Sequence, residues 1–398
     1  MSVYPRDGKW PSPFNEAFRA GIAPDRKILI SDCTLRDGEQ QADVVLDRAA
    51  KVEIAKALDA IGIFEIEAGV VASSAEDRMA ISDICALGLK AKISVLCRGL
   101  EADIDDAAKL GVWGVRLSFP VSPIERMHKL KGIGDDDYLK RALELVRYAK
   151  DKGFYVIFSP YDTTRADLPF LLKFAHALQE AQTDRLRIVD TTGCALPATI
   201  AYVTREIRTA APSLPIEIHC HNDFGLACAN TLAALESGAG FVSSTVNGLG
   251  ERCGNASSEE IIMALEVLYD HRTGIDLKSL TALSKRIAEL SRIALPVNKP
   301  VVGENAFRHE AGMVVAGVLK DPFTAEPYSP EIVGQHRRIM IGKKSGLVSI
   351  QHKAAELGIP MPADLAGPML EAVKTEALRR GRSLSDDEFR DLAKSIAA

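Results

Sequence analysis

The stretch Leu214-Pro215-Ile216-Glu217-Ile218-His219-Cys220-His221-Asn222-Asp223 joins an apolar run that alternates like a buried strand to a strongly polar end. Residues two apart on a strand point to the same side, so His219 and His221 are expected to present both imidazoles to one face. Two imidazoles at the end of a strand make half of a divalent metal site, whereas an isolated His-x-His is more often satisfied by ordinary hydrogen bonds. The rest of the chain has to decide between these two interpretations.

Similar strand-like runs alternate with amphipathic stretches along residues 27–293. The predicted strands are 27–32, 63–67, 91–96, 113–118, 154–159, 186–190, 216–220 and 241–246. Apolar residues three and four apart predict helices between them, for example over 46–61, 138–152, 226–237 and 258–269. Eight strand–helix units are the number that a (β/α)8 TIM barrel needs, and polar chemistry at successive strand ends favours this α/β barrel over a doubly wound sheet.

The sequence pattern changes at both ends of this region. Residues 1–26 are polar and interrupted by proline, which predicts an N-terminal arm before a barrel domain at 27–293. The run Leu295-Pro296-Val297-Asn298-Lys299-Pro300 marks a boundary. Beyond it we expect a small α+β and helical C-terminal region, with a linker subdomain at 294–345 and a helical subdomain at 346–398.

The composition excludes several classes of function. The chain has 398 residues, 47% hydrophobic content and a formal net charge of -5, which is typical of a soluble globular protein and offers no basic surface for nucleic acid. Seven scattered cysteines without CxxC pairs indicate reduced thiols in a cytoplasm. The sequence has no apolar run of membrane-spanning length and no signal peptide, so we expect a cytoplasmic enzyme or binding protein with no membrane partner.

Three polar stretches follow strands that would be neighbours in a closed barrel. They are 32–40 after the first strand, 219–223 after the seventh and 247–255 after the eighth, and the active site of a TIM barrel lies at these strand ends. We therefore expect a mixed nitrogen and oxygen site for Mg, Mn, Zn or Co, completed by water. Its predicted ligands are Asp37, His219, His221 and the amide oxygen of Asn255. Helix capping by Asp32, Asp37 or Asn255 is the alternative for each residue alone, but the constellation as a whole favours a metal.

These motifs resemble those of the DRE-TIM metallolyases, and within them the homocitrate, isopropylmalate and citramalate synthases. The matching stretches are Asp32-Cys33-Thr34-Leu35-Arg36-Asp37-Gly38-Glu39-Gln40, Asp190-Thr191-Thr192-Gly193, 219–225, 247–255, 303–312 and 342–346. The resemblance covers roughly residues 27–350. It implies a Claisen-type condensation, in which the α-carbon of an acyl-CoA such as acetyl-CoA attacks the keto carbon of a 2-oxo acid and thioester hydrolysis makes the reaction irreversible.

The resemblance also implies what the individual residues do. The predicted ligands would hold a divalent metal that chelates the keto and carboxylate oxygens of the oxo acid. Arg36 would place a positive charge against the oxygen that gains negative charge, and Thr191 would hydrogen-bond the substrate carboxylate. The residues expected to orient the substrate at the pocket wall are Gln40, Glu67 and Ser159. A homodimer is expected as well, because the linker of this family reaches the barrel mouth of the partner.

Two positions depart from the synthase pattern. Tyr161 stands where synthases carry a catalytic glutamate after the fifth strand, and Val314 replaces a linker histidine that helps to deprotonate the acyl-CoA. Losing a positioned general base typically costs about 10²–10⁴-fold in rate. Two catalytic candidates could compensate: His309 as a base, unless it is structural, and Tyr161 as a hydrogen-bond donor or acid, unless it only fills space.

These departures keep other functions open. An aldolase or acyl-CoA lyase that uses the same enolate chemistry is the second interpretation, and a catalytically silent binding protein is the third. Four further residues carry expectations of their own. Arg116 and Ser118 could read a distal group on the substrate, or Arg116 could form an ordinary ion pair at the barrel mouth. Cys253 lies in the loop where the related hydroxymethylglutaryl-CoA lyase carries a catalytic cysteine, but passive packing is expected for it, and Tyr328 could face the active site.

Overall fold

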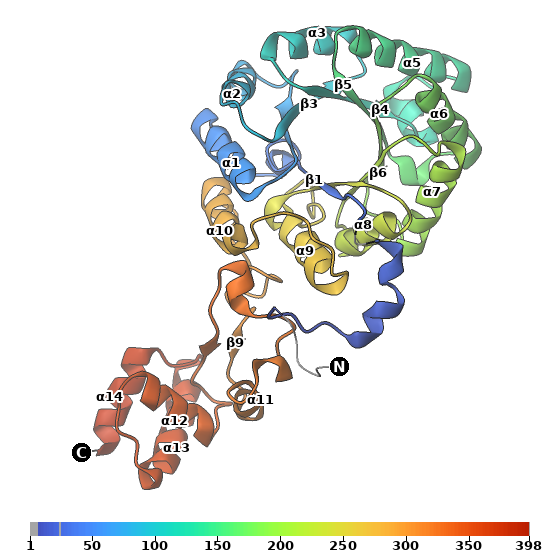
Figure 1. Cartoon of the computed structure of the whole chain (residues 1–398). Coiled ribbons are helices and arrows are strands. Elements are labelled where there is room, and N and C mark those ends of the chain that lie inside the picture. Colours follow the sequence, from blue (N-terminus) through green and yellow to red (C-terminus); the bar gives the residue numbers. More distant parts are fainter. Residues whose placement is uncertain (1–6, 24, 398) are drawn as a thin grey trace. The chain divides into compact units, whose positions relative to one another are not determined.

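The computed structural model describes residues 7–23 and 25–397. Within them, β1 to β8 form a closed parallel barrel in chain order, surrounded by helices (Figure 1). The strands are β1 (Leu29–Asp32), β2 (Glu65–Val70), β3 (Lys92–Arg98), β4 (Gly114–Pro120), β5 (Tyr155–Tyr161), β6 (Arg185–Asp190), β7 (Ile216–Cys220) and β8 (Phe241–Ser244). Every predicted strand overlaps one of these, so the prediction of a TIM barrel is confirmed.

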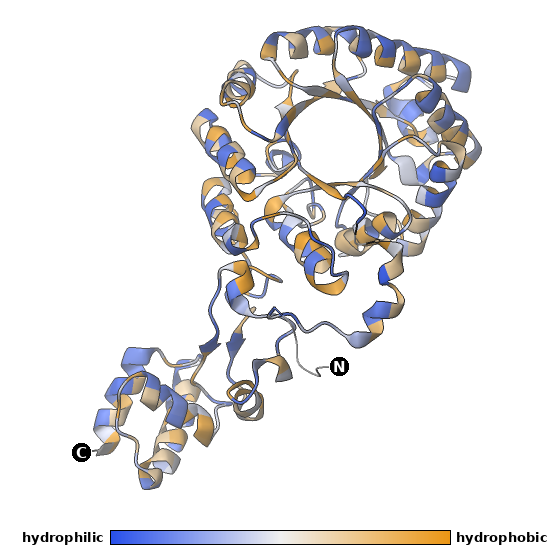
Figure 2. Ribbon diagram, viewed as in Figure 1, coloured by the Kyte–Doolittle hydropathy of each residue, from blue (hydrophilic) through white to orange (hydrophobic). Residues whose placement is uncertain are grey.

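The helices of the barrel follow the predicted amphipathic stretches, and hydrophilic and hydrophobic residues alternate along them (Figure 2). They are α1 (Arg48–Ile61), α2 (Ala75–Ala86), α3 (Glu101–Leu110), α4 (Pro123–Lys129), α5 (Asp135–Asp151), α6 (Leu168–Glu180), α7 (Pro197–Ala210), α8 (Ala227–Glu236), α9 (Ser258–Met263) and α10 (Leu280–Ser291). α9 continues as a π-helical turn, Ala264–Leu268.

Local chemistry fixes where the first of these helices begins and ends. Asp47 caps α1 by accepting a hydrogen bond from the backbone N–H of Ala50, and Gly62 ends the helix at a φ of 95°, a left-handed conformation that glycine adopts without strain. The cap of α1 is therefore neither Asp32 nor Asp37, the two capping alternatives in the sequence. The N-cap position of α9 is Ser257, not Asn255. None of the three capping candidates at the strand ends therefore caps α1 or α9.

The described chain divides into two compact units, residues 13–295 and residues 7–12 with 296–397. The second unit holds a two-stranded parallel sheet, β9 (Arg308–His309) and β10 (Arg338–Ile339), and four helices that the described residues form: α11 (Gly312–Val318), α12 (Leu347–Glu356), α13 (Ala363–Arg380) and α14 (Asp386–Ala397). Val315, Ile350, Met369 and Phe389 lie in its own buried core. Its finer division at residue 345 stays a prediction, and the arm proposed at 1–26 lies partly outside the described residues.

No helix in the described residues is both long and apolar enough to cross a bilayer.

Candidate active site

Three ligating side chains from distant parts of the chain meet at the carboxyl ends of β1 and β7. Asp37 lies in the turn after β1, His219 on β7 and His221 directly after it. The Nε2 atoms of the two histidines are 3.3 Å apart, and Oδ2 of Asp37 is 4.0 Å from the first and 3.9 Å from the second. All three residues are buried, and their ligating atoms lie within 4.8 Å of one another, close enough to share one ion. The predicted convergence of these stretches is therefore confirmed.

Asn255 completes this group on the side of β8. Its Nδ2 donates hydrogen bonds to Oδ2 of Asp37 at 2.5 Å and to the carbonyl of Leu249 at 3.0 Å. Both neighbours are acceptors, so the amide nitrogen must face them. Its Oδ1 is buried and has no hydrogen-bond partner among the described residues. A buried acceptor without a partner costs free energy, and a cation would satisfy it.

Protonation states suit a divalent cation. Burial disfavours the charged form of Asp37, but Arg36 and then the two histidines outweigh it and lower the pKa of this carboxyl to about 2. Burial lowers the pKa of both His219 and His221, so the imidazoles are neutral at neutral pH. Nδ1 of His219 lies 3.0 Å from Oγ of Ser243, which leaves Nε2 for a metal. One carboxylate, two neutral imidazoles and an unpaired amide oxygen fit the donor set that was predicted.

The loop that carries Asn255 depends on a glycine. A Cβ added at Gly250, which has a φ of 154°, would lie 2.2 Å from Nδ2 of Asn255 and 3.0 Å from Oδ2 of Asp37. We expect Gly250→Ala to displace Asn255 and to weaken Mn²⁺ binding by about 10–100-fold, the usual cost of disturbing the support of a metal ligand. Calorimetric titration with Mn²⁺ measures this. Gly153→Ala is the control, because Gly153 is also left-handed (φ 84°) but a Cβ there meets nothing within 4 Å; an equal loss in both variants would contradict the prediction.

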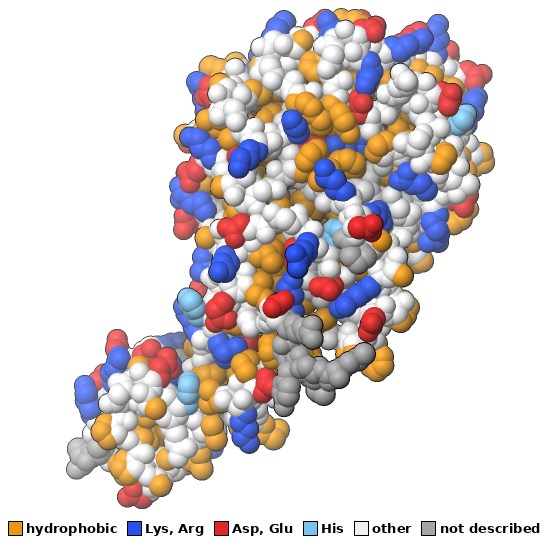
Figure 3. All heavy atoms as spheres, in the orientation of Figure 1, with side chains coloured by type: hydrophobic (Ala, Val, Ile, Leu, Met, Phe, Trp, Pro, Cys, Tyr) orange, Lys and Arg blue, Asp and Glu red, His pale blue; other side chains and the backbone are white. Residues whose placement is uncertain are grey.

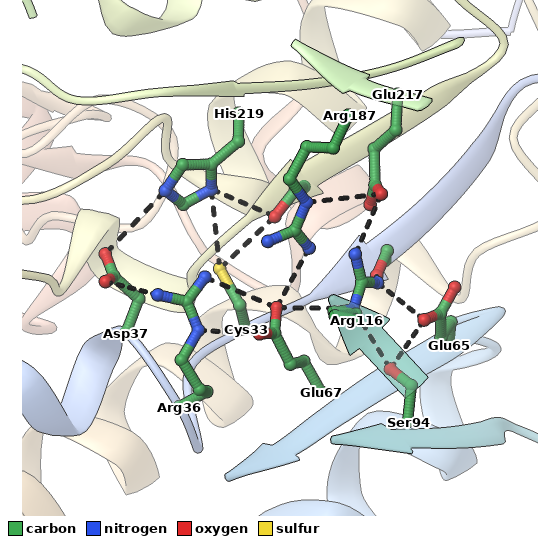
Figure 4. Close-up of polar contacts among 12 residues, drawn as sticks. Cys33, Arg36, Asp37, Glu65, Glu67, Ser94, Arg116, Arg187, Glu217 and His219 are labelled. Carbon is green, nitrogen blue, oxygen red and sulfur yellow. Dashed lines mark hydrogen bonds and ion pairs between the residues drawn. The ribbon is translucent and has the colours of Figure 1, made fainter. Parts of the chain in front are cut away.

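Arg36 lies beside the three ligands and is held from two sides. Its Nη1 donates to Oδ1 of Asp37 at 2.7 Å, and its Nε donates to Oε1 of Glu67 at 2.7 Å (Figure 4). Its Nη1 also donates to Oε1 of Gln40 at 3.2 Å. A cavity of about 200 Å³ opens beside Arg36 and Gln40, with Gly69 in its wall. Glu67 is fully buried, and both its oxygens accept hydrogen bonds from guanidinium groups, among them that of Arg36. Its predicted contact with the substrate stays a prediction.

Below Arg36 the barrel interior is filled by ion pairs instead of the usual layers of apolar side chains. Arg116 donates to Glu65, Glu217, Ser31 and Ser94 with all its distances between 2.5 and 3.1 Å, and none of its side chain is exposed. The other members of the network are Arg185, Arg187 and Glu67. The prediction that Arg116 lies at the barrel mouth is therefore wrong: it forms ion pairs, but it is sealed in the interior and cannot touch a substrate.

The part of the mouth next to β7 is made by the ends of β6 and β5. The backbone N–H of Asp162 donates to Oγ1 of Thr191 at 2.7 Å, so the hydroxyl proton of Thr191 remains available for an acceptor in the mouth. Ser159 is buried on β5 and Tyr161 is half-buried at its end. Nζ of Lys129, on α4, lies 4.9 Å from the centre of the Tyr161 ring. Burial raises the pKa of this phenol, and Lys129 opposes the rise.

Comparisons with known proteins agree with this geometry. Residues 27–287 match the family model described as HMGL-like. The chain belongs to the HMGL-like family. Residues 301–381 match a second model, described as homocitrate synthase post-HMGL domain-like. The resemblance to the DRE-TIM metallolyases is thereby confirmed.

Individual relatives of this HMGL-like chain are synthases. Homocitrate synthase AksA of Methanothermobacter thermautotrophicus is 40% identical over 97% of the chain and 97% of that protein. The protein named 2-isopropylmalate synthase 2 of Caldanaerobacter subterraneus subsp. tengcongensis is 40% identical over 94% of the chain and 96% of its own length. The solved structure of an HMG-CoA lyase from Bacillus subtilis, 22% identical, matches 69% of the chain and 97% of that chain with a TM-score of 0.61, which supports the fold.

The remaining candidates of this HMGL-like chain lie in the second unit or on a loop. Nε2 of His309 is 2.9 Å from Oε1 of Glu326, which Arg337 also binds, so this histidine has a structural partner; its role as a base stays a prediction. Val314 is exposed on α11. Tyr328 packs its ring against Phe307, and burial raises its pKa to about 12. Cys253 is exposed, so passive packing does not account for it.

The sequence interpretation missed buried members of the ion-pair network around Glu67, the partner of Arg36. Arg187 lies on β6 and donates to Oε2 of Glu67 at 2.9 Å, and Glu217 on β7 binds both Arg116 and Arg187. A signal for them was present. Charged residues at alternate positions of runs predicted to be buried strands, as in Arg185-Leu186-Arg187 and Glu217-Ile218-His219, indicate an interior that is polar on one side.

Proposed function

We propose that this chain is a divalent-metal-dependent enzyme that condenses an acyl-CoA, with acetyl-CoA as the first choice, with a 2-oxo acid. The observation that carries the proposal is the buried group Asp37, His219 and His221 beside the guanidinium of Arg36. The printed names of its relatives, homocitrate synthase and 2-isopropylmalate synthase, support the same reaction class. We place the enzyme in the cytoplasm, because its seven cysteines are all free.

Asp37, His219, His221 and the amide oxygen of Asn255 would hold the metal, which would supply Lewis-acid polarisation of the keto group. The protein's own groups then orient and stabilise. The hydroxyl of Thr191 donates a hydrogen bond to the carboxylate of the oxo acid. Arg36 places its fixed charge where the keto oxygen becomes negative, and because Glu67 and Asp37 hold it, it needs no reorganisation during the reaction.

Proton abstraction from the acyl-CoA is the step for which the usual residues are absent. Val314 cannot accept a proton, and Tyr161 with Lys129 offers a phenol on the wall of β5 where a carboxylate is expected. We propose His309 and Tyr161 as the groups that handle protons, His309 as base and Tyr161 as hydrogen-bond donor. The same two replacements favour a second candidate function, an aldolase or acyl-CoA lyase. Such an enzyme uses the same enolate chemistry but does not need a base that deprotonates acetyl-CoA.

A thiol-release assay separates these functions. The purified full-length protein is incubated with Mg²⁺ or Mn²⁺, acetyl-CoA and one of a panel of 2-oxo acids, and free CoA is measured. Release that requires both the metal and an oxo acid supports the condensing enzyme. Cleavage of a 2-hydroxy acid to an oxo acid without acetyl-CoA would support the aldolase instead. Metal-dependent ligand binding with neither reaction would leave a silent binding protein.

We also expect a homodimer, because the second unit carries the family's linker motifs and a linker in this family reaches the partner's barrel. Sedimentation velocity at assay concentration should give a species of twice the chain mass of 43.0 kDa. A fully active monomer would contradict this expectation.

A further inference from the structure

The chain turns sharply where β5 ends. Asp162, which directly follows Tyr161, has a φ of 63° and a ψ of 36°, in the left-handed region, and it is fully buried. Residues other than glycine seldom take this conformation, although aspartate tolerates it better than most. Such conformations persist only where their surroundings fix them, and they cluster at ligand sites. The contacts of Asp162 therefore indicate both what holds this turn and what the turn positions.

Both carboxylate oxygens of Asp162 are anchored. Oγ of Ser122 donates a hydrogen bond to Oδ2, and Nε of Arg165 donates one to Oδ1 at 2.7 Å. Ser122 is fully buried and is itself fixed, because it is the N-cap of α4 and accepts a hydrogen bond from the backbone N–H of Glu125 at 3.3 Å. The buried carboxylate thus has a partner at each oxygen, and these partners hold the residue in its left-handed conformation.

The turn binds the chain to the end of β6, the neighbouring strand. Its three consecutive residues each hydrogen-bond one residue there: Asp162 to Thr191, Thr163 to Val189 and Thr164 to Asp190. The first of these contacts reaches a predicted substrate-binding residue. The backbone N–H of Asp162 donates to Oγ1 of Thr191 at 2.7 Å, so the position of this oxygen is fixed and its proton is left for another acceptor.

An ion pair holds the backbone of Thr191. Nη2 of Arg252 donates to the carbonyl of Thr191 at 2.7 Å, while the same guanidinium binds both oxygens of Asp223 at 2.8 and 3.0 Å. Acidic and basic side chains are also interspersed over the barrel in the view of Figure 3, and this pair uses its charges to fix a backbone group. Thr191 is therefore held at its hydroxyl and at its carbonyl, so its side chain does not have to reorganise when an anion binds.

We infer that Asp162 is a positioning residue, which fixes the hydroxyl of Thr191 so that this hydroxyl donates its hydrogen bond to the carboxylate of the oxo acid. The inference rests on the proposed function, in which Thr191 receives that carboxylate. The alternative is that the turn at 162–164 only stabilises the barrel. Thr164 separates the two, because its contact with Asp190 belongs to the same turn and does not involve Thr191.

Calorimetric titration of the Mn²⁺-loaded, full-length protein with pyruvate and with 2-oxoglutarate measures the affinity for an oxo acid, and the tighter ligand is then used for the variants. Asp162→Ala removes both anchors and makes the left-handed conformation costly. We expect it to weaken binding by at least about 10-fold, the scale of losing a hydrogen bond to a charged group. Asp162→Asn should stay within about 3-fold, because asparagine also tolerates the left-handed conformation and can bind Ser122 and Arg165.

Thr164→Val is the matched control. It removes one contact between the turn and β6, so it should lower the melting temperature without weakening the binding of the oxo acid. An equal loss of affinity in Thr164→Val and Asp162→Ala would overturn the inference and leave the proposed function standing, because the turn would then act only through the stability of the barrel.

A double-mutant cycle shows whether Asp162 acts through Thr191. In a Thr191→Val background, which lacks the hydroxyl, Asp162→Ala should cost less than about 2-fold in affinity, because the group that it positions is already gone. Additive losses in the cycle would again overturn the inference alone. If the unaltered protein binds Mn²⁺ but neither oxo acid, the proposed function fails and the inference falls with it.

Melting curves establish that each variant is folded. Should Asp162→Ala not fold, Ser122→Ala removes one of the two anchors and takes its place in the same cycle. Its loss of affinity, expected to be at least about 3-fold, must likewise vanish in the Thr191→Val background. A loss that persists there would contradict the inference.

Discussion

His219→Ala is expected to abolish both metal binding and turnover. The imidazole supplies one of the three buried ligating groups, and its removal leaves Asp37 and His221 with too few donors to hold the ion at the same position. Mn²⁺ affinity should fall by at least about 100-fold, more than the cost of disturbing an outer residue. The rate of CoA release should fall by at least about 10²–10³-fold, as it does when a preorganised charge stabiliser is lost.

The matched control is His176→Ala. His176 is exposed on α6 of the same unit, so this variant should keep full metal affinity and activity. Asp37→Ala should behave like His219→Ala, although it also removes one of the two acceptors of Nη1 of Arg36. Folding of each variant is checked by far-ultraviolet circular dichroism. A folded His219→Ala protein that binds Mn²⁺ normally and turns over at the original rate would remove the basis for the whole site.

Arg116→Met is expected to cause the largest loss of stability. The guanidinium binds Glu65 and Glu217 within the barrel interior, and none of the three side chains is exposed. Removing it leaves buried carboxylates with less compensation, which typically costs about 3–5 kcal/mol of unfolding free energy. Adding Glu217→Gln to the variant should restore part of the loss, because the surplus negative charge is removed with the partner.

The unfolding of the barrel unit can be measured separately from that of the second unit. The chain has two tryptophans, and Trp10 belongs to the second unit while Trp113 stacks on Tyr155 at the base of the barrel. In a Trp10→Phe background, urea unfolding monitored by fluorescence therefore reports on the barrel unit. Arg48→Met is the control, because Arg48 and its partner Asp83 form an exposed ion pair and should contribute little. Equal changes in the two variants would show that the interior network does not stabilise the barrel.

The candidate metal ligands could be predicted from the sequence, because their convergence follows from strand alternation and from the order of strands in a closed barrel. Alternation along β7 placed His219 and His221 on one side, and the adjacency of the first, seventh and eighth strands brought Asp37 and Asn255 to them. The pattern could not predict how deep along the barrel axis a side chain lies. Alternation decides whether a side chain points into a barrel, but its height along the axis depends on strand tilt and stagger, which are properties of the closed sheet. Arg116 was placed at the mouth for this reason.

The sequence by itself determined the (β/α)8 order, the candidate metal ligands and the absence of a histidine at Val314, because each follows from a short motif or from a period of two or about four residues. Only the tertiary structure decided that Arg116 is enclosed, that Glu67 is bound by Arg36 from within the barrel, and that Lys129 lies against Tyr161. These contacts join residues from separate strands and helices, such as Arg116 and Glu217, which are 101 positions apart. Their energies arise from burial and charge pairing in one shared interior, which no local pattern encodes.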